Sequence, residues 1–390
     1  MRAHALLGAS KAQRWINCPP SARLTEHMPD TKSKYAEEGT TAHELAELKL
    51  VRRFTVCNAV RRKELDARLA ALKNSEYYND EMETVIQSYV EWVEERYTAA
   101  RAKDKDAEMY FEARFRLDDW VPDAFGTCDV VIVSSGVLEV IDLKYGRGKA
   151  VSAVNNPQLR LYAMGAYAEH NWLYNFDEVI MTIAQPRRDD LSTETMRVTD
   201  LLEWMNQVVK PAAELAYQGK GEYRPGDHCD RCQASGQCRA LADKNMELLA
   251  YEFKDPALLA PDEIGGILFI AEQLADWAKN VKEYAFDQAL TGNRIPQWKL
   301  VEGKSNRVIT DKAAAMAAFA AAGIEGSKYK KPADLVGITD LEKKIGKKTV
   351  SEILGALITK PPGKPALVPE SDPRAEWDSL DNDFADIEFE

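Results

Sequence analysis

The sequence predicts an α/β fold in which helices flank a mixed central sheet. The first observation is a change of hydrophobic period near Met109, where helical spacing gives way to alternation. The second is a pair of strand-like segments joined by the turn SSG at 134–136, which predicts a β-hairpin. The third is that helical segments stand before and after these strands. The expected strands are 109–117, 126–133, 137–144 and 177–187, and the expected helices are 39–54, 80–103, 157–171 and 201–219.

Local signals justify the helices in order. Thr41 and Glu44 have the spacing of a capping box, so a helix is expected to begin near 39. The segment 80–103 has apolar residues at helical spacing. Asn156 can cap the next helix, and Pro157 suits its first turn. The helix 201–219 contains a proline after its first half.

The composition changes after Cys238, which predicts three parts of the chain. Residues 1–245 form the α/β core, and 246–365 form a mainly helical accessory region. Residues 366–390 follow the proline-rich end of that region and are expected to be an acidic disordered tail.

The chain of 390 residues is 45% hydrophobic and 29% charged, an ordinary globular balance that argues against disorder throughout the chain. It has no apolar run of about 18 residues, so no membrane span is expected. No secretion signal is recognisable at the N-terminus, and we expect a cytoplasmic protein, in the bacterial host if a phage encodes it. Residues 370–390 carry nine acids against Arg374 alone, which accounts for most of the net charge of -12. The charge therefore does not exclude nucleic acid as a partner.

Acidic residues and a lysine are expected to meet at the hairpin. Asp142 and Lys144 are two apart on one strand and therefore share a face, and Asp129 begins the partner strand. Two carboxylates and a lysine suit a divalent metal that positions a water and stabilises charge on a phosphate. The lysine can orient or deprotonate that water. Solvated surface charge is the alternative for this pattern taken alone.

Three further residues add to this group. Gln158 and Tyr162 are four apart on one helix face and can bond a phosphate or a base, although such pairs also occur as ordinary helix surface. His43 is expected near the N-terminus of its helix, where the helix dipole disfavours protonation. A neutral imidazole there can join the metal shell, and a satisfied partly buried histidine is the alternative.

Six cysteines in a chain without a secretion signal favour metal or cluster binding over disulfides. Cys229, Cys232 and Cys238 form a compact knot, and Cys18 is the one plausible fourth ligand. Four thiolates suit either a 4Fe–4S cluster or tetrahedral zinc, and the spacing leaves both open. A remote fourth ligand indicates a structural staple between the N-terminal segment and the end of the core. Cys57 and Cys128 are expected to be plain buried thiols.

These motifs resemble those of the PD-(D/E)XK nucleases of RecB type. Asp129, the Asp142–Lys144 pair and the Gln158–Tyr162 pair look like three of their motifs, and His43 falls where that group carries an extra metal ligand. The cysteine spacing resembles the iron–sulfur staple of AddB-like nucleases. Residues 1–365 are similar to an uncharacterised phage and prophage family of this kind.

The resemblance implies a restriction-endonuclease-like core and a deoxyribonuclease, more an exonuclease than an endonuclease, acting in phage recombination or replication. It implies that His43, Asp129 and Asp142 bind Mg²⁺ or Mn²⁺ and that Lys144 assists the attacking water. It also favours the 4Fe–4S cluster over zinc. Two departures are Cys128 in place of the proline before Asp129, and Asp142 where glutamate is commoner. Glu112, on the preceding strand, is a further candidate for the same cleft.

The competing hypothesis is a catalytically silent DNA-binding adaptor that keeps the nuclease fold. The nuclease hypothesis predicts a metal cleft lined by basic groups, for which Arg147, Lys149 and Arg160 are candidates, and a solvated face is their alternative. The tail interleaves acids with Trp377, Phe384 and other apolar residues. This pattern is similar to tails that recruit partners, which makes a phage annealing, single-strand-binding or replication protein a candidate partner. A tail that folds back over the protein's own DNA site and a purely solubilising tail are the alternatives.

Overall fold

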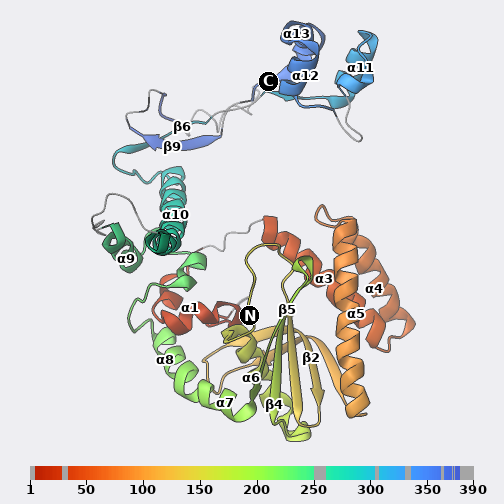
Figure 1. Cartoon of the computed structure of the whole chain (residues 1–390), viewed down its shortest axis with the longest axis vertical. Coiled ribbons are helices and arrows are strands. Elements are labelled where there is room, and N and C mark those ends of the chain that lie inside the picture. Colours follow the sequence, from red (N-terminus) through yellow and green to blue (C-terminus); the bar gives the residue numbers. More distant parts are fainter. Residues whose placement is uncertain are drawn as a thin grey trace, which may run out of the picture. The chain divides into compact units, whose positions relative to one another are not determined.

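The computed structural model describes residues 5–28, 34–249, 261–303, 307–329, 335–361, 364–370, 372 and 374–377. The chain divides into two compact units, Met1–Asp276 and Trp277–Glu390. The long helix α10 (Pro261–Leu290) spans this division (Figure 1). Each unit is described by itself.

A five-stranded mixed sheet forms the centre of the first unit, in the order β1-β2-β3-β4-β5. Strands β3 and β4 are parallel, and the other neighbours are antiparallel. The parallel pair is joined through helix α6 (Pro157–Tyr174), as a crossover between parallel strands requires. The strands are β1 (Glu108–Arg116), β2 (Phe125–Ser134), β3 (Val137–Leu143), β4 (Glu178–Gln185) and β5 (Asp190–Arg197).

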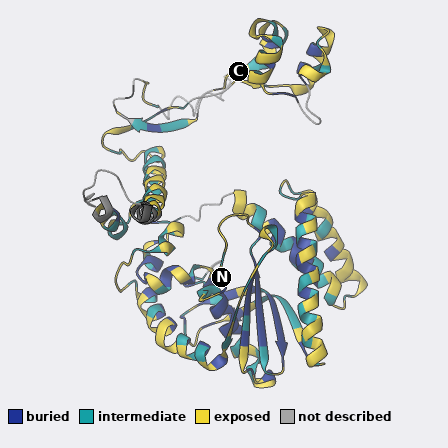
Figure 2. Cartoon of the chain, viewed as in Figure 1, coloured by how far each residue is buried: buried dark blue, intermediate teal, exposed yellow. Residues whose placement is uncertain are grey.

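Helices cover both faces of this sheet (Figure 1). On one face, which we call the α5 side, lie α3 (Lys34–Phe54), α4 (Ala59–Leu72) and α5 (Asp80–Lys103). The other face, which we call the α6 side, packs against α6 and four shorter helices. Both faces of the central strands are buried, as the dark strands of Figure 2 show, so β2 carries the continuous apolar run VVIV. The shorter helices are α1 (Ala12–Asn17), α2 (Ser21–Leu24), α7 (Val198–Trp204) and α8 (Lys210–Gln218).

Helix α6 begins and packs as its sequence indicates. The Asn156 side chain accepts hydrogen bonds from the backbone N–H groups of Gln158 and Leu159, and Pro157 occupies the first turn. Gly165 allows close approach to β1, because a Cβ atom there would lie 2.4 Å from Cβ of Phe115. These two features fix where the residues of α6 lie relative to the hairpin.

Several elements differ from the sequence-based expectations. Helix α3 begins at Lys34, and Thr41 Oγ1 donates to the Glu37 carbonyl, so Thr41 lies inside the helix and caps nothing. Strand β5 was not expected, because its Asp, Ser, Thr and Glu residues are polar enough to resemble a loop; it is an edge strand. The helix expected at 201–219 is instead α7, a π-helical stretch Met205–Val209, and α8. The hairpin and α5 lie where they were expected.

The described residues of the second unit form helices and two small sheets. Strand β6 (Trp298–Glu302) pairs with β9 (Pro365–Pro369), and β7 (Val308–Ile309) pairs with β8 (Ile358–Thr359). A separate core includes the buried residues Phe319, Leu341 and Val350. The helices here are α11 (Lys312–Ala321), α12 (Ile338–Ile345) and α13 (Lys347–Leu354).

The observed division of the chain corrects the expected boundaries. The first unit extends past 245 through α9 (Arg239–Leu249) and half of α10, because a helical composition does not reveal what a helix packs against. Residues 366–369 belong to β9 and are therefore not part of a disordered tail. Beyond them, the backbone N–H of Trp377 donates to the Leu300 carbonyl of β6 at 2.7 Å. Residues 378–390, the bulk of the expected acidic tail, lie outside the described residues.

Candidate functional site

The alternation of side chains slips by one residue in both β1 and β2. In β1, Met109 and Phe111 face the α5 side, whereas Ala113 and Phe115 face the α6 side. In β2, Val130 faces the α5 side and Cys128 the α6 side. Regular alternation would not permit this, because residues two apart share a face and neighbours do not. Glu112 and Asp129 are the residues at which the slip occurs.

The ladder is interrupted at the same place. Phe111 pairs with Val130 and Ala113 with Cys128, but the position between them, Glu112 opposite Asp129, is not a ladder pair. Glu112 has a φ of 46°, in the left-handed region that residues with a Cβ rarely adopt. Strained non-glycine residues of this kind cluster at functional sites. The slip adds both carboxylates to the α5 side, where α3 supplies His43.

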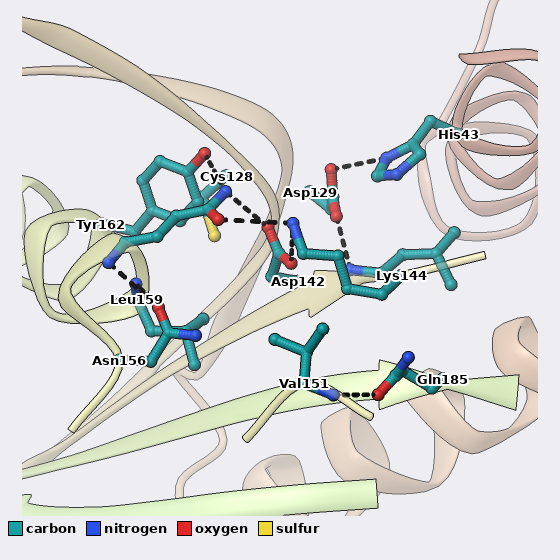
Figure 3. Close-up of polar contacts among 12 residues, drawn as sticks. His43, Cys128, Asp129, Asp142, Lys144, Val151, Asn156, Leu159, Tyr162 and Gln185 are labelled. Carbon is teal, nitrogen blue, oxygen red and sulfur yellow. Dashed lines mark hydrogen bonds and ion pairs between the residues drawn. The ribbon is translucent and has the colours of Figure 1, made fainter. Parts of the chain in front are cut away.

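His43, Glu112 and Asp129 form the one group of potential metal ligands found among the described residues, with their ligand atoms mutually within 4.8 Å. His43 Nδ1 lies 3.0 Å from Asp129 Oδ1. The other oxygen of Asp129, Oδ2, accepts from the Leu143 backbone N–H at 2.6 Å and so ties β2 to the end of β3. Figure 3 shows His43 and Asp129 joined in this way.

Burial and charge shift the pKa values in this group. Burial raises the pKa of Glu112 to about 7, and the neighbouring Asp129 adds to the effect. For His43, burial lowers the pKa, but the attraction of Asp129 outweighs it, so the pKa is raised. This corrects the expectation from the helix dipole. Because α3 begins at Lys34, His43 lies in the third turn, and the dipole effect is confined to the first.

Asp142 and Lys144 form a second cluster with α6. Lys144 Nζ lies 2.8 Å from Asp142 Oδ2 and donates to Gln158 Oε1 at 3.3 Å. Gln158 Nε2 lies 3.2 Å from Asp142 Oδ1 and 2.9 Å from the Tyr162 hydroxyl, to both of which it donates (Figure 3). Burial raises the pKa of Asp142, and Lys144 opposes this. Burial also raises the pKa of Tyr162, so its hydroxyl stays protonated.

The structure thus brings the sequence-predicted residues together in two adjoining clusters. In this arrangement the Asp142 carboxylate is engaged by Lys144 and Gln158, and it is not in the group formed by His43, Glu112 and Asp129. The expected metal ligands were His43, Asp129 and Asp142. The observed group contains Glu112 in place of Asp142, which lies at the border of the group. The reason is the alternation of β3: Ile141 and Leu143 face the α5 side, so Asp142 between them points to the α6 side, where it meets Gln158 of α6.

Two supporting residues were missed by sequence reasoning. Gln185, at the end of β4, is buried and accepts from the Val151 backbone N–H at 2.7 Å, which holds the segment after β3 (Figure 3). The Arg187 guanidinium lies 4.6 Å from the centre of the Tyr145 ring and pairs with Glu38 at 3.0 Å. The segment IAQPR indicated both residues, because polar residues that directly follow a buried strand lie at the edge of the sheet.

The three basic residues expected to contact DNA are all engaged within the protein. Arg160 is buried, pairs with Glu194 at 2.8 Å and stacks over Trp204, so it is a core residue. Arg147 pairs with Glu81, and Lys149 lies 3.3 Å from Asp230. Helical position alone did not show that Arg160 points inward toward β5.

The three cysteines of the predicted knot and Cys18 line one small cavity. Cys18 reaches it from the end of α1, and Cys229, Cys232 and Cys238 reach it from the segment before α9. Arg14 of α1 also donates to Gln233 of the knot at 3.2 Å. Burial raises the pKa of Cys229, and the other three thiols add to this. Of the remaining cysteines, Cys128 is buried, whereas Cys57 is partly exposed and so is not the buried thiol that was expected.

Fold and site together define an α/β protein with a helix-flanked mixed sheet, a His–Glu–Asp group formed by α3, β1 and β2, and a four-cysteine cavity. The chain belongs to the family described as "Protein of unknown function (DUF2800)", which matches residues 4–375. A solved structure described as "Crystal structure of SSO0001" is 16% identical, covering 57% of this chain and 95% of that chain, with a TM-score of 0.24. Among the described helices, none is long and apolar enough to cross a membrane.

Proposed function

We propose that the protein is a metal-dependent deoxyribonuclease of the PD-(D/E)XK type, and an exonuclease more than an endonuclease. The observation that carries the proposal is the contact of Lys144 with buried Asp142, beside the group of His43, Glu112 and Asp129. A binding module has no need of a lysine, several carboxylates and a histidine held together in this way. The motif resemblance to RecB-like nucleases supports the exonuclease.

The donor set fits a hard divalent cation. His43, Glu112 and Asp129 would hold Mg²⁺ or Mn²⁺, with Asp142 at the border of the site, since oxygen-rich sites with an imidazole suit these ions. Bound there, the cation supplies charge stabilisation for a phosphodiester and lowers the pKa of a water.

Each nearby residue then has a definite role. Lys144 orients the attacking water or offsets charge that develops on the phosphate. Gln158 positions Lys144 and Asp142 together, because its amide bonds both. The Tyr162 hydroxyl accepts from Gln158 and keeps its own proton for a phosphate or a base. Asp129 is fixed by the Leu143 N–H, which orients its second oxygen toward His43.

The four-cysteine cavity offers four thiolates, the donor set of either a structural 4Fe–4S cluster or tetrahedral zinc. The resemblance of the cysteine spacing to the iron–sulfur staple of AddB-like nucleases favours the cluster. The centre would fasten α1 to the segment before α9.

The test is cleavage of end-labelled linear and circular DNA, single- and double-stranded, with Mn²⁺, Mg²⁺ or EDTA. The anaerobically purified protein is compared with Lys144→Ala and with Lys105→Ala, an exposed lysine outside the site. We expect metal-dependent loss of linear DNA that Lys144→Ala abolishes and Lys105→Ala preserves. If a cluster-loaded preparation binds DNA but cleaves none, the nuclease proposal is wrong and the DNA-binding adaptor replaces it.

A further inference from the structure

Beyond Glu112 and Asp129, the two strands continue as an exposed ribbon. Arg114 is opposite Thr127 and Arg116 is opposite Phe125. Alternation is regular from the slip onward, because Ala113, Phe115 and Cys128 all face the α6 side. Arg114 and Arg116 therefore share the face of Glu112, and Thr127 and Phe125 share the face of Asp129. Both arginines and Thr127 are exposed, and Phe125 is half-buried.

This ribbon lines a groove of about 880 Å³ together with Arg23 of α2 and Tyr217 of α8. Two arginine–aromatic stacks stand in it. The Arg114 guanidinium lies 3.9 Å from the centre of the Phe125 ring, and the Arg23 guanidinium lies 4.9 Å from that of Tyr217. Arg23 is held by the Tyr217 carbonyl at 2.7 Å, so this stack is fixed before any ligand binds.

The charges of the groove are unevenly neutralised. Arg116 pairs with Asp118 at 2.6 Å, and Arg23 pairs with Glu26 at 2.9 Å. The ion pairs found among the described residues include none with Arg114. The Arg114 guanidinium can therefore bind an anionic ligand. Of the two ribbon arginines, Arg114 lies closer along β1 to Glu112 and Asp129. Arg116 lies about 13 Å farther along β1 than Glu112, at about 3.3 Å per strand residue.

The chemistry fits a single-stranded nucleic acid better than a duplex. Aromatic rings and guanidinium planes stack on unpaired bases, whose faces a duplex conceals. Arginines beside those rings bind the phosphates. The two acids in the groove, Asp118 and Asp123, disfavour the denser charge of a duplex.

We propose that this arginine–aromatic groove binds the single-stranded end of the nucleic-acid substrate and directs it along β1 and β2 toward Glu112 and Asp129. The direction toward a reaction centre rests on the proposed function, whereas the binding does not. Arg114 is the residue closest to the carboxylates, and Phe125 supplies the stacking surface.

The test is fluorescence anisotropy with a labelled oligothymidine of about 12 nucleotides, measured in EDTA so that no cleavage occurs. Arg114→Ala and Phe125→Leu are compared with the matched control Arg62→Ala, an exposed arginine on α4. We expect each groove variant to weaken binding roughly tenfold and Arg114→Ala to reduce the salt dependence. We expect Arg62→Ala to bind like the wild type, and a duplex of the same length to respond much less to the groove variants.

The outcomes separate the two proposals. Groove variants with wild-type melting temperatures and undiminished oligothymidine binding would overturn the groove, even if the wild type cleaves DNA. Equal losses on duplex and single strand would overturn the preference for unpaired bases. Binding that depends on Arg114 and Phe125, in a protein that cleaves no DNA with any metal, would sustain the groove and reject the nuclease.

Discussion

Glu112 and Asp129 face each other across β1 and β2 at the register position where the ladder between the flanking pairs is broken, and Glu112 has a left-handed backbone. This relationship places two carboxylates beside His43 on a face that regular strands would give to other residues. Glu112 thus has the strained backbone and is also one of the candidate metal ligands.

Replacing Glu112 separates strain from chemistry. Both Glu112→Gly and Glu112→Ala remove the carboxylate, but only glycine removes the Cβ that disfavours a φ of 46°. We expect the glycine variant to be more stable than the alanine variant by about 1 kcal/mol in urea unfolding without metal. We expect both to lose most Mn²⁺ binding by calorimetry. Equal stabilities, or Mn²⁺ binding like that of the wild type, would contradict this account.

The pH dependence of Mn²⁺ binding follows from Glu112. Burial raises its pKa to about 7, so a proton competes with the metal below that pH. In the metal-free protein the raised pKa means that stability is lost as the pH rises through about 7, because the unfolded chain gives up this proton at lower pH. We expect the Mn²⁺-induced rise in melting temperature to grow from pH 6 to pH 8. Glu112→Gln is expected to show a weaker trend, the remainder coming from His43, and an unchanged trend would exclude Glu112.

Gln158 is expected to act through Lys144 and Asp142. Gln158→Ala removes the amide that bonds both, so their relative position is no longer fixed. We expect kcat to fall roughly tenfold or more with little change in KM, as for other residues that position metal-site groups. Gln207→Ala, at an exposed position, is the control. A Gln158→Ala variant whose KM rises while its kcat stays that of the wild type would contradict a positioning role.

Cys18 is expected to be required for the four-cysteine centre. Cys18→Ser removes the ligand from the N-terminal segment, so the iron and sulfide content of anaerobic preparations should drop and thermal stability should fall. Cys57→Ser, at a cysteine outside the cavity, should change neither. Iron content like that of the wild type in Cys18→Ser would remove Cys18 from the centre, and stoichiometric zinc in the wild type would replace the cluster.

Gly165 is expected to matter for packing and not for chemistry. A Cβ there would meet Phe115 at 2.4 Å, so Gly165→Ala should destabilise the protein by about 1 to 3 kcal/mol. Gly39, in α3, has no atom within 4 Å of an added Cβ. Gly39→Ala should therefore stabilise by up to about 1 kcal/mol, as glycine-to-alanine changes in helices do. Urea unfolding of the two variants checks both signs, and the same sign in both would contradict the packing argument.

Much of the fold could be predicted because its signals are local. The cap at Asn156, the apolar spacing of 80–103 and the turn at 134–136 each depend on residues close in sequence. Strand β5 was missed because an edge strand need not be apolar. The start of α3 was misplaced because Thr41 bonds within its helix instead of capping it.

The sequence by itself determined which residue types are available at the site: a histidine, carboxylates, a lysine and four cysteines at informative spacings. Only the tertiary structure decided their arrangement. It turned Glu112 and Asp129 to the α5 side through a slip in strand pairing, engaged Asp142 with Lys144, and buried Arg160 against Glu194. The physical reason is that side-chain direction in a strand depends on its partner strand, and the partner of a charge depends on which opposite charges folding brings near. Neither is encoded in the neighbouring residues alone.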